Sequence, residues 1–187
     1  MTYLSKGIVG NGSTEQLLII SHCGGEYTLK GKEAACWLNG RFETSTVKSV
    51  MEEHAVGHLQ RIGLAECEDE DSEISKYRIL TRCILCPAVS KGVSPPLRGL
   101  EKRLMIWLTK AGLHLTIAEL IYLIDHDVPP SEDLLYTSNR QALVERIYTV
   151  DTTADCILET QMEAVASRDN VVNTVLRLIK KKKLVIL

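Results

Sequence analysis

Apolar and polar residues alternate most regularly at the C-terminal end of the chain, over residues 167–187. From residue 168 onward they separate, at the period of an α-helix, into two faces. The apolar face comprises Val171, Val172, Val175, Leu176, Leu178 and Ile179. The polar face comprises Asp169, Asn170, Asn173, Thr174, Arg177, Lys180 and Lys181. Ser167 suits the N-cap and the run 184–187 indicates a buried strand, so we predict an amphipathic helix that leads directly into a strand.

The N-terminal part of the chain predicts a hairpin followed by a short helix. Residues 16–21 form an apolar run, a glycine pair marks a turn, and residues 26–29 alternate as in a return strand. Residues 32–39 then follow a helical period and are closed by a glycine. Residues 1–14 are polar and rich in glycine, and we interpret them as a flexible lead-in.

Residues 44–62 predict a longer helix that Gly63 closes. A strand at residues 64–66 comes next, followed by an acidic stretch over residues 66–73 and a run with strand character over residues 77–86. The order of helix, strand, charged tip and strand resembles the recognition helix and two-stranded wing of the winged-helix superfamily. This resemblance covers about residues 45–85 and is one of pattern, without a diagnostic motif.

The stretch KGVSPPL at residues 91–97 breaks both periodicities, and we place a linker at residues 89–98. Thr116 suits the N-cap of one of the helices beyond it. Helical segments are predicted between this linker and the terminal helix, at residues 100–110, 117–124, 131–148 with an interruption near 136–138, and 152–164.

The predicted fold class is therefore α+β and mainly helical, with two tandem winged-helix-type domains that carry small β-hairpins. The first domain spans residues 15–88 and the second spans residues 99–187 with additional helices. Helix, tight turn, helix and strand at the C-terminal end is the order of a helix-turn-helix unit. The helices at 116–124 and 139–148 are the alternative pair, and the pattern leaves both pairs open.

Composition excludes several classes of protein. The 187 residues are 45% hydrophobic and 25% charged, which is typical of globular domains. No apolar run approaches the roughly 20 residues of a membrane helix, and residues 1–12 lack the features of a signal peptide. We therefore expect a cytoplasmic protein without membrane contact, in which the six cysteines are reduced thiols. A net charge of −2 argues against indiscriminate coating of nucleic acid.

Candidate metal ligands occur in two places. Cys83 and Cys86 have the spacing of a zinc half-site, but no second pair follows, and residues three apart in a strand point to opposite faces. His54 and His58 lie one helical turn apart, without the glutamate that a zinc-protease helix carries. We predict buried thiols, a helix face that is either solvated or in contact with phosphates, and no metal site.

Catalytic arrangements are equally incomplete. His22 and Cys23 are neighbours, yet adjacent residues of a strand point apart and no third orienting group is evident. No glycine-rich loop has the residues that hold a phosphate. We predict that the protein is not an enzyme and needs no cofactor.

The leading functional hypothesis is a DNA-binding protein, of the kind that regulates transcription, which contacts duplex DNA through its terminal helix. Cationic residues there would meet phosphates, and amide side chains would reach base edges. The residues expected to contact DNA are Arg168, Asn170, Asn173, Thr174, Arg177, Lys180 and Lys181. Winged-helix proteins commonly bind as dimers, so we expect a homodimer. The acidic stretch 66–73 counts against DNA contact by the first domain, because like charges repel.

The alternative hypothesis is a protein- or peptide-interaction module or scaffold without DNA binding. The segments that support it are Tyr27-Thr28-Leu29, Ala34-Ala35-Cys36-Trp37-Leu38, Gly40, and a helix with Leu59 that precedes Gly63-Leu64. They are similar to the PqqD-like peptide-binding domains over residues 20–66. That resemblance implies a hairpin whose exposed edge takes up a peptide as an added strand. The stretch between the helices is shorter here than in that family, so no binding residues are carried over.

Overall fold

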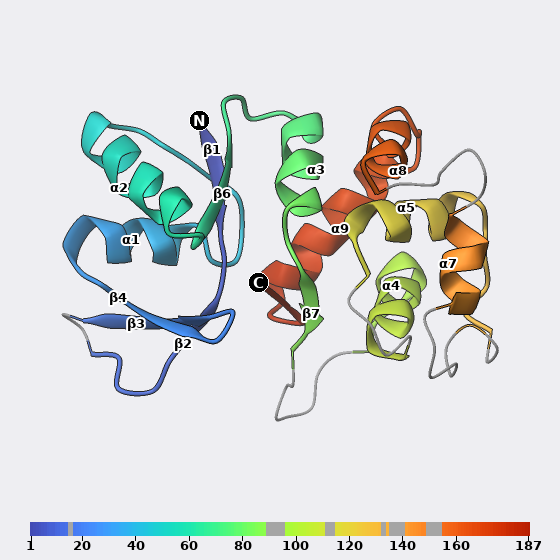
Figure 1. The fold of residues 1–187 in the computed structure, drawn as a ribbon, viewed down its shortest axis with the longest axis horizontal. Helices are drawn as coiled ribbons and strands as arrows, with labels where there is room; N and C mark the ends of the chain where they lie inside the picture. Colours follow the sequence, from blue (N-terminus) through green and yellow to red (C-terminus); the bar gives the residue numbers. More distant parts are fainter. Residues whose placement is uncertain (15–16, 89–95, 111–114, 132–133, 135–140, 149–154) are drawn as a thin grey trace.

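The computed structural model describes residues 1–14, 17–88, 96–110, 115–131, 134, 141–148 and 155–187 (Figure 1). The helices are α1 (Gly31–Asn39), α2 (Val50–Arg61), α3 (Glu73–Thr81), α4 (Gly99–Lys110), α5 (Ile117–Asp125), α7 (Gln141–Ile147), α8 (Asp155–Met162) and α9 (Arg168–Lys180). The strands are β1 (Thr2–Ser5), β2 (Ile8–Val9), β3 (Leu18–His22), β4 (Gly25–Leu29), β5 (Ser45–Thr46), β6 (Ala65–Glu68), β7 (Leu85–Pro87) and β8 (Leu184–Ile186). The predicted α+β, mainly helical class is confirmed.

The leading hairpin is present and is one part of a three-stranded antiparallel sheet of order β2-β3-β4. Cys23 and Gly24 form its two-residue turn, and both have positive φ, at 48° and 81°. Positive φ at both central residues defines the turn type whose twist matches that of paired strands. One face of the sheet, with Leu18, Ile20 and Leu29, is buried under α1 and α2.

Residues 1–14 are not a flexible lead-in, because strand β1 is the central strand of a second antiparallel sheet of order β5-β1-β6. Side-chain hydrogen bonds fasten it to α1: the Tyr3 hydroxyl donates to the Cys36 carbonyl, and the Trp37 Nε1–H donates to the Lys6 carbonyl, both at 2.9 Å. The segment has few apolar residues, and the strands that pair with β1 lie far along the chain. The local pattern therefore did not indicate a strand.

Helix α2 begins later than the predicted residue 44. Ser49 is its N-cap and accepts a hydrogen bond from the Glu52 amide at 3.3 Å. The residues before it include strand β5, which pairs with β1. Gly63 ends the helix region with φ of 78°, a conformation that glycine adopts without strain.

The predicted two-stranded wing after α2 is wrong. Strand β6 pairs with β1 rather than with a following strand, and most of the predicted return strand is helix α3. Ser72 caps this helix by accepting a hydrogen bond from the Ser75 amide at 3.1 Å. Tyr77, Ile79 and Leu80 are buried together. Their β-branched and aromatic content suggested a strand, whereas a capped helix buries the same side chains.

In the C-terminal part, α4, α5, α9 and β8 lie close to their predicted positions. Thr116 forms a reciprocal capping box with Glu119 at the start of α5. Strand β8 pairs antiparallel with β7, which precedes α4 in the chain. Predictions at residues 89–95 of the linker, at 111–114, at 135–140 and at 149–154 lie outside the described residues.

Two hydrophobic clusters organise the molecule. One lies between the hairpin, α1 and α2, and the other is enclosed by the helices from α3 onward. Strand β1 contributes Tyr3 to the first cluster and Leu4 to the second, since successive side chains of a strand point to opposite faces. Helix α3 and strand β7, placed in the first domain from the sequence, pack in the second cluster. The domain limits themselves stay a prediction.

Within the described residues, none of the helices has both the length and the apolar character needed to cross a membrane.

Candidate functional site

Helix α9, the predicted DNA-contacting element, lies inside the C-terminal cluster and packs against α3, α4 and α5. Val171, Val172 and Val175 are buried, as the periodicity predicted. Ser167 is at the N-cap position, but its hydroxyl donates to Asp125 Oδ1 at 3.0 Å and makes no side-chain capping bond. The helix start is therefore held by a tertiary contact instead of a cap.

The exposed face of α9 is engaged by carboxylates from other parts of the chain. Asn173 Nδ2 donates to Glu73 Oε2 at 2.8 Å, and Lys181 Nζ lies 2.6 Å from Glu101 Oε1. Lys180 pairs with Glu43. Each contact neutralises or occupies a group that the DNA hypothesis assigned to a phosphate or a base.

Arg177 and Lys180 remain the most accessible cations of this face, with side chains 59% and 67% exposed. Arg177 Nε lies 4.0 Å from Glu101 Oε1, and Arg177 also donates to the Thr174 hydroxyl at 2.8 Å. Exposed ion pairs of this kind are weak and salt-sensitive. Both cations can therefore exchange their present partners for another anion.

Two of the residues assigned to DNA contact are not available on the surface. Thr174 is fully buried, and its hydroxyl donates to the Asn170 carbonyl at 2.7 Å. The Arg168 side chain is only 16% exposed, pairs with Asp169 at 2.6 Å and donates to the Glu163 carbonyl. The polarity of Thr174 suggested an exposed position, whereas the helix that carries it packs against α3, α4 and α5 and leaves this residue buried. Asn170 is exposed.

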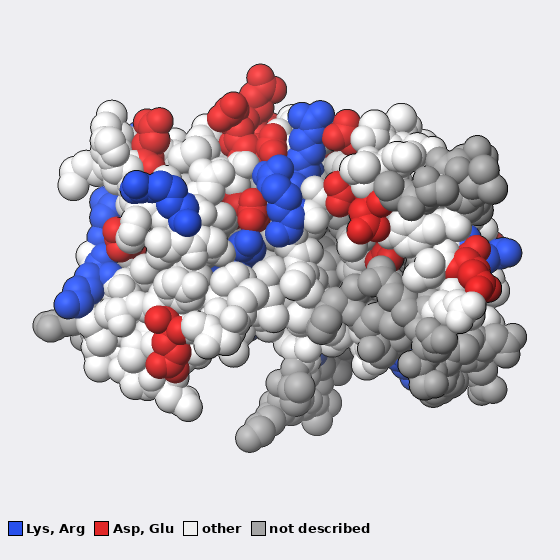
Figure 2. Space-filling model, viewed as in Figure 1, with Lys and Arg blue, Asp and Glu red and all other residues white. Residues whose placement is uncertain are grey.

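The acidic stretch is divided by the fold. Glu66 pairs with Lys6 at 2.7 Å and with Arg82 at 2.9 Å, and Arg82 also reaches Glu68 at 2.8 Å. A hydrogen bond from Lys76 lowers the pKa of Glu73. The exposed remainder is Asp69, Glu70 and Asp71, at the top of the molecule in Figure 2.

The outer edge of β4 is a second candidate site. The strand pairs with β3 on one side, and it is an edge strand of its sheet. In a hairpin closed by a two-residue turn, the pair next to the turn, His22 and Gly25, exchanges hydrogen bonds, and the pairs then alternate. The backbone N–H and C=O groups of Glu26 and Thr28 therefore point away from β3. Both side chains are exposed.

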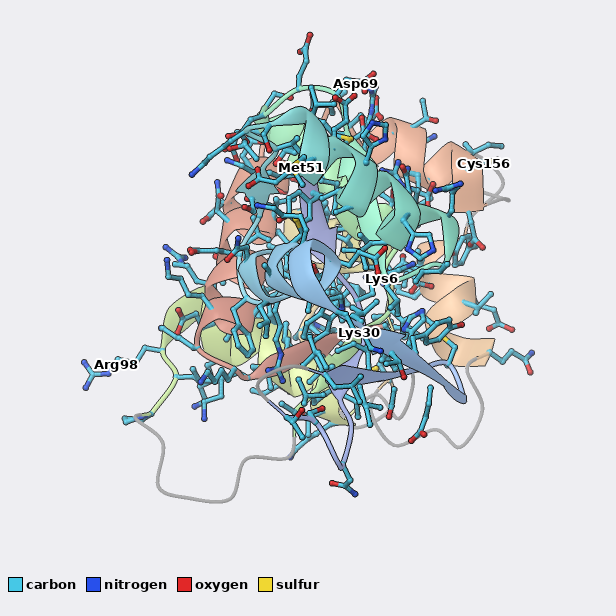
Figure 3. All side chains as sticks on the ribbon, turned by 90° about the vertical axis from the view of Figure 1, so that its left-hand side faces the viewer. Lys6, Lys30, Met51, Asp69, Arg98 and Cys156 are labelled. Carbon is cyan, nitrogen blue, oxygen red and sulfur yellow. The ribbon has the colours of Figure 1, made fainter. Side chains whose placement is uncertain are left out.

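A hollow of about 630 Å³ lies where the end of β4 and the start of α1 meet helix α2. Figure 3 views this end of the molecule, with Lys30 at the junction of β4 and α1. The hollow, which we call the basic groove, is lined by Lys30, Lys32, Glu33, His54, Ala55, His58 and Arg61. It holds three permanently cationic side chains and one carboxylate, so its charge is positive.

The polar groups of the basic groove are only partly paired. His58 Nδ1 lies 2.8 Å from Glu33 Oε1 but outside hydrogen-bonding geometry, and Lys32 Nζ lies 3.8 Å from Glu52 Oε1. Arg61 Nε donates within its own helix to the Gly57 carbonyl at 3.3 Å. Across the part of the chain that the structure describes, no carboxylate pairs with Lys30 or Arg61. These two cations are available to an incoming anion.

In the basic groove, His54 and His58 lie beside cationic side chains, an environment that the sequence only partly indicated. Their one-turn spacing was recognised, but Lys30 and Lys32 were not connected with them. The spacing of Lys30 and Lys32 around a glycine carries no functional signal alone, because only the packing of α1 on α2 brings these residues together.

The cysteines differ in their surroundings. Cys23 lies in the hairpin turn and not in a strand, and its Sγ is 3.5 Å from His22 Nε2, so the expectation that these two side chains point apart is wrong. Cys83 is buried, its Sγ donates to the Ile79 carbonyl at 3.1 Å, and burial raises the pKa of its thiol to about 12. Burial likewise raises the pKa of Cys67 to about 11. No three histidine, cysteine or acidic side chains gather as a metal site within the described ranges.

Comparison of the chain with protein-family models, with curated proteins and with solved structures gave no match. We therefore infer function from the geometry of the β4 edge, the basic groove and helix α9.

Proposed function

We propose that this protein is a peptide- or protein-interaction module that takes up an extended segment as an added strand on β4. The observation that carries this proposal is the pair of outward backbone positions at Glu26 and Thr28 on an exposed edge strand. Main-chain hydrogen bonds to such an edge supply affinity for any segment that can extend. An unpaired edge is otherwise a liability that proteins cover or block.

The neighbouring elements support this function. A leading hairpin followed by two packed helices is the arrangement that the resemblance to PqqD-like domains implies, and we propose that the N-terminal part is a winged-helix variant of that kind. Strand β6 pairs with β1 in the other sheet, and β4 is an edge strand of its own sheet, of order β2-β3-β4. The sheet behind β4 is anchored by buried Ile20 and Leu29, so the edge is presented by a rigid scaffold.

The test replaces Thr28 by proline, which removes the outward N–H without removing a bond to β3. Peptides selected from a random displayed library against the wild-type protein are expected to lose most of their affinity for Thr28→Pro. Thr28→Val keeps the N–H and the strand, so it is the matched control and should bind as the wild type does. Selected peptides that bind Thr28→Pro with unchanged affinity would contradict strand addition.

DNA binding through α9 is a second candidate, favoured by the exposure of Arg177 and Lys180. Its test is fluorescence anisotropy of labelled duplex DNA at two salt concentrations, beside an Arg177→Glu/Lys180→Glu variant. Phosphate contact requires binding that weakens steeply with salt and is lost in the variant. Absence of binding at low salt would contradict this candidate. It would also remove the reason to expect a homodimer that binds two half-sites of DNA.

A further inference from the structure

We propose that the basic groove binds acidic side chains that flank the strand-forming segment, so that the partner is an acidic extended peptide. This inference rests on the proposed function, because it names the class of segment that β4 takes up. Charge complementarity is the first observation behind it: three cations and two imidazoles face the hollow against the single carboxylate of Glu33. A carboxylate entering the groove would meet Lys30 and Arg61, which have no carboxylate partner in the described structure.

Continuity between the two sites is the second observation. Lys30 follows Leu29, the last residue of β4, and it also lines the groove. A strand advances by about 3.3 Å per residue, so a segment paired opposite Glu26 and Thr28 reaches Lys30 about two residues further on. The end of the bound segment that passes Leu29 therefore enters the groove. Backbone pairing on β4 would provide affinity, and the groove would provide selection by charge.

The same cations would also attract the phosphates of a nucleic acid. The open edge of β4 favours a polypeptide over a nucleic acid as the partner. Only a polypeptide offers the alternating N–H and C=O groups that pair with the Glu26 and Thr28 backbone. A short acidic flank next to a strand satisfies both sites at once.

The test titrates isotope-labelled full-length protein with two synthetic peptides and follows backbone amide resonances. Both peptides carry the core Thr-Val-Thr-Val-Thr; one is flanked at both ends by Asp-Asp-Asp and the other by Ser-Ser-Ser. The acidic peptide is expected to bind about tenfold more tightly, the effect of one charge-assisted contact. Its shifts should include Glu26 and Thr28 on the edge, and His58 and Arg61 in the groove.

Charge reversal separates the groove from general attraction. Lys30→Glu and Arg61→Glu should reduce the affinity for the acidic peptide to that for the serine peptide. Lys102→Glu, at an exposed position of α4, makes the same change of charge away from the groove and should have little effect. Each variant must keep the wild-type amide spectrum outside the groove, so a loss of folding is recognised directly.

Each outcome has a distinct meaning. Equal affinity for the two peptides, with shifts at the edge, overturns the acidic preference and leaves strand addition standing. Shifts confined to the groove, and unchanged in Thr28→Pro, show an anion site that is independent of β4 and overturn the combined proposal. Displacement of the acidic peptide by duplex DNA, with no edge shifts, reassigns the groove to phosphates. Binding of neither peptide contradicts both proposals.

Discussion

Single residues at the crossing of β1 and α1 determine how closely the two elements approach. Gly40 follows α1, and its carbonyl accepts a hydrogen bond from the Ser5 amide at 2.8 Å. A Cβ at this position would lie 2.6 Å from both Ser5 Oγ and a ring carbon of Tyr3. The absence of a side chain at residue 40 is therefore what allows β1 to pass across the helix end.

The change Gly40→Ala is expected to lower the free energy of unfolding by about 2 kcal/mol, because the buried side chains of Ser5 and Tyr3 must shift to admit the methyl group. Urea denaturation measures this change. Gly57→Ala is the matched control, since nothing lies within 4 Å of its Cβ position and alanine favours a helix. That variant should gain about 0.5–1 kcal/mol. Equal effects of the two substitutions would contradict the close approach at Gly40.

His22 links stability to pH. Burial, together with the nearby charge of Lys6, lowers the pKa of its imidazole below the usual value of 6.5. The unfolded chain therefore binds a proton at a higher pH than the folded protein does, and stability falls as the pH drops below about 6.5. Replacement by glutamine removes this linkage.

The free energy of unfolding of His22→Gln should consequently vary less between about pH 7 and pH 5.5 than that of the wild type. Urea titrations at several pH values measure the slope, and this window lies above the range in which most carboxylates titrate. An unchanged slope in the variant would show that His22 is protonated alike in the folded and unfolded chain.

At the scale of elements, the serines that precede α3 and α9 differ in whether their side chains cap the helix. Ser72 caps α3 through a hydrogen bond to the Ser75 amide, whereas Ser167 bonds to Asp125. Ser72→Ala should therefore cost about 1 kcal/mol of stability. Ser167→Ala should cost only a few tenths of a kcal/mol, as an exposed contact does. Thermal or urea unfolding of the pair tests the assignment, and a larger loss for Ser167→Ala would reverse it.

Helices and strands could be predicted from the sequence where a single local pattern determined the secondary structure. The amphipathic period of residues 168–180 and the apolar run after it defined α9 and β8 correctly. Residues 77–81 were misread because Tyr77 and Ile79 favour strands, while the capping serine at residue 72 and packing against α9 decide for a helix. Strand β1 could not be inferred, since both of its partners lie far away in the chain.

Sites were less predictable than elements for a related reason. Thr174 was assigned to the exposed face from its polarity, yet neighbouring helices bury it. The basic groove combines the start of α1 with the polar side of α2, and sequence spacing does not report how two helices pack. His54 and His58 were identified as a pair, but their cationic neighbours Lys30 and Lys32 required the tertiary structure.

At the scale of the whole molecule, the two hydrophobic clusters are joined by shared strands and by ion pairs. Strand β1 has a side chain in each cluster, and the Gly7 amide donates to the Ile186 carbonyl at 2.7 Å. The pairs of Glu66 with Lys6 and Arg82 lie at the same junction. The proposed peptide site is at the far end of the N-terminal cluster, away from α9 (Figure 1). A partner bound there would leave the solvent-facing side of α9 uncovered.

Amide hydrogen exchange of the protein, with and without a peptide selected from the displayed library, tests the central proposal most directly. The proposal predicts that the Glu26 and Thr28 amides exchange rapidly in the free protein and become protected when the peptide is bound. The amides of α9 should be unaffected, because that helix lies at a separate surface. Protection that appears on α9 while Glu26 and Thr28 keep exchanging rapidly would contradict strand addition at β4.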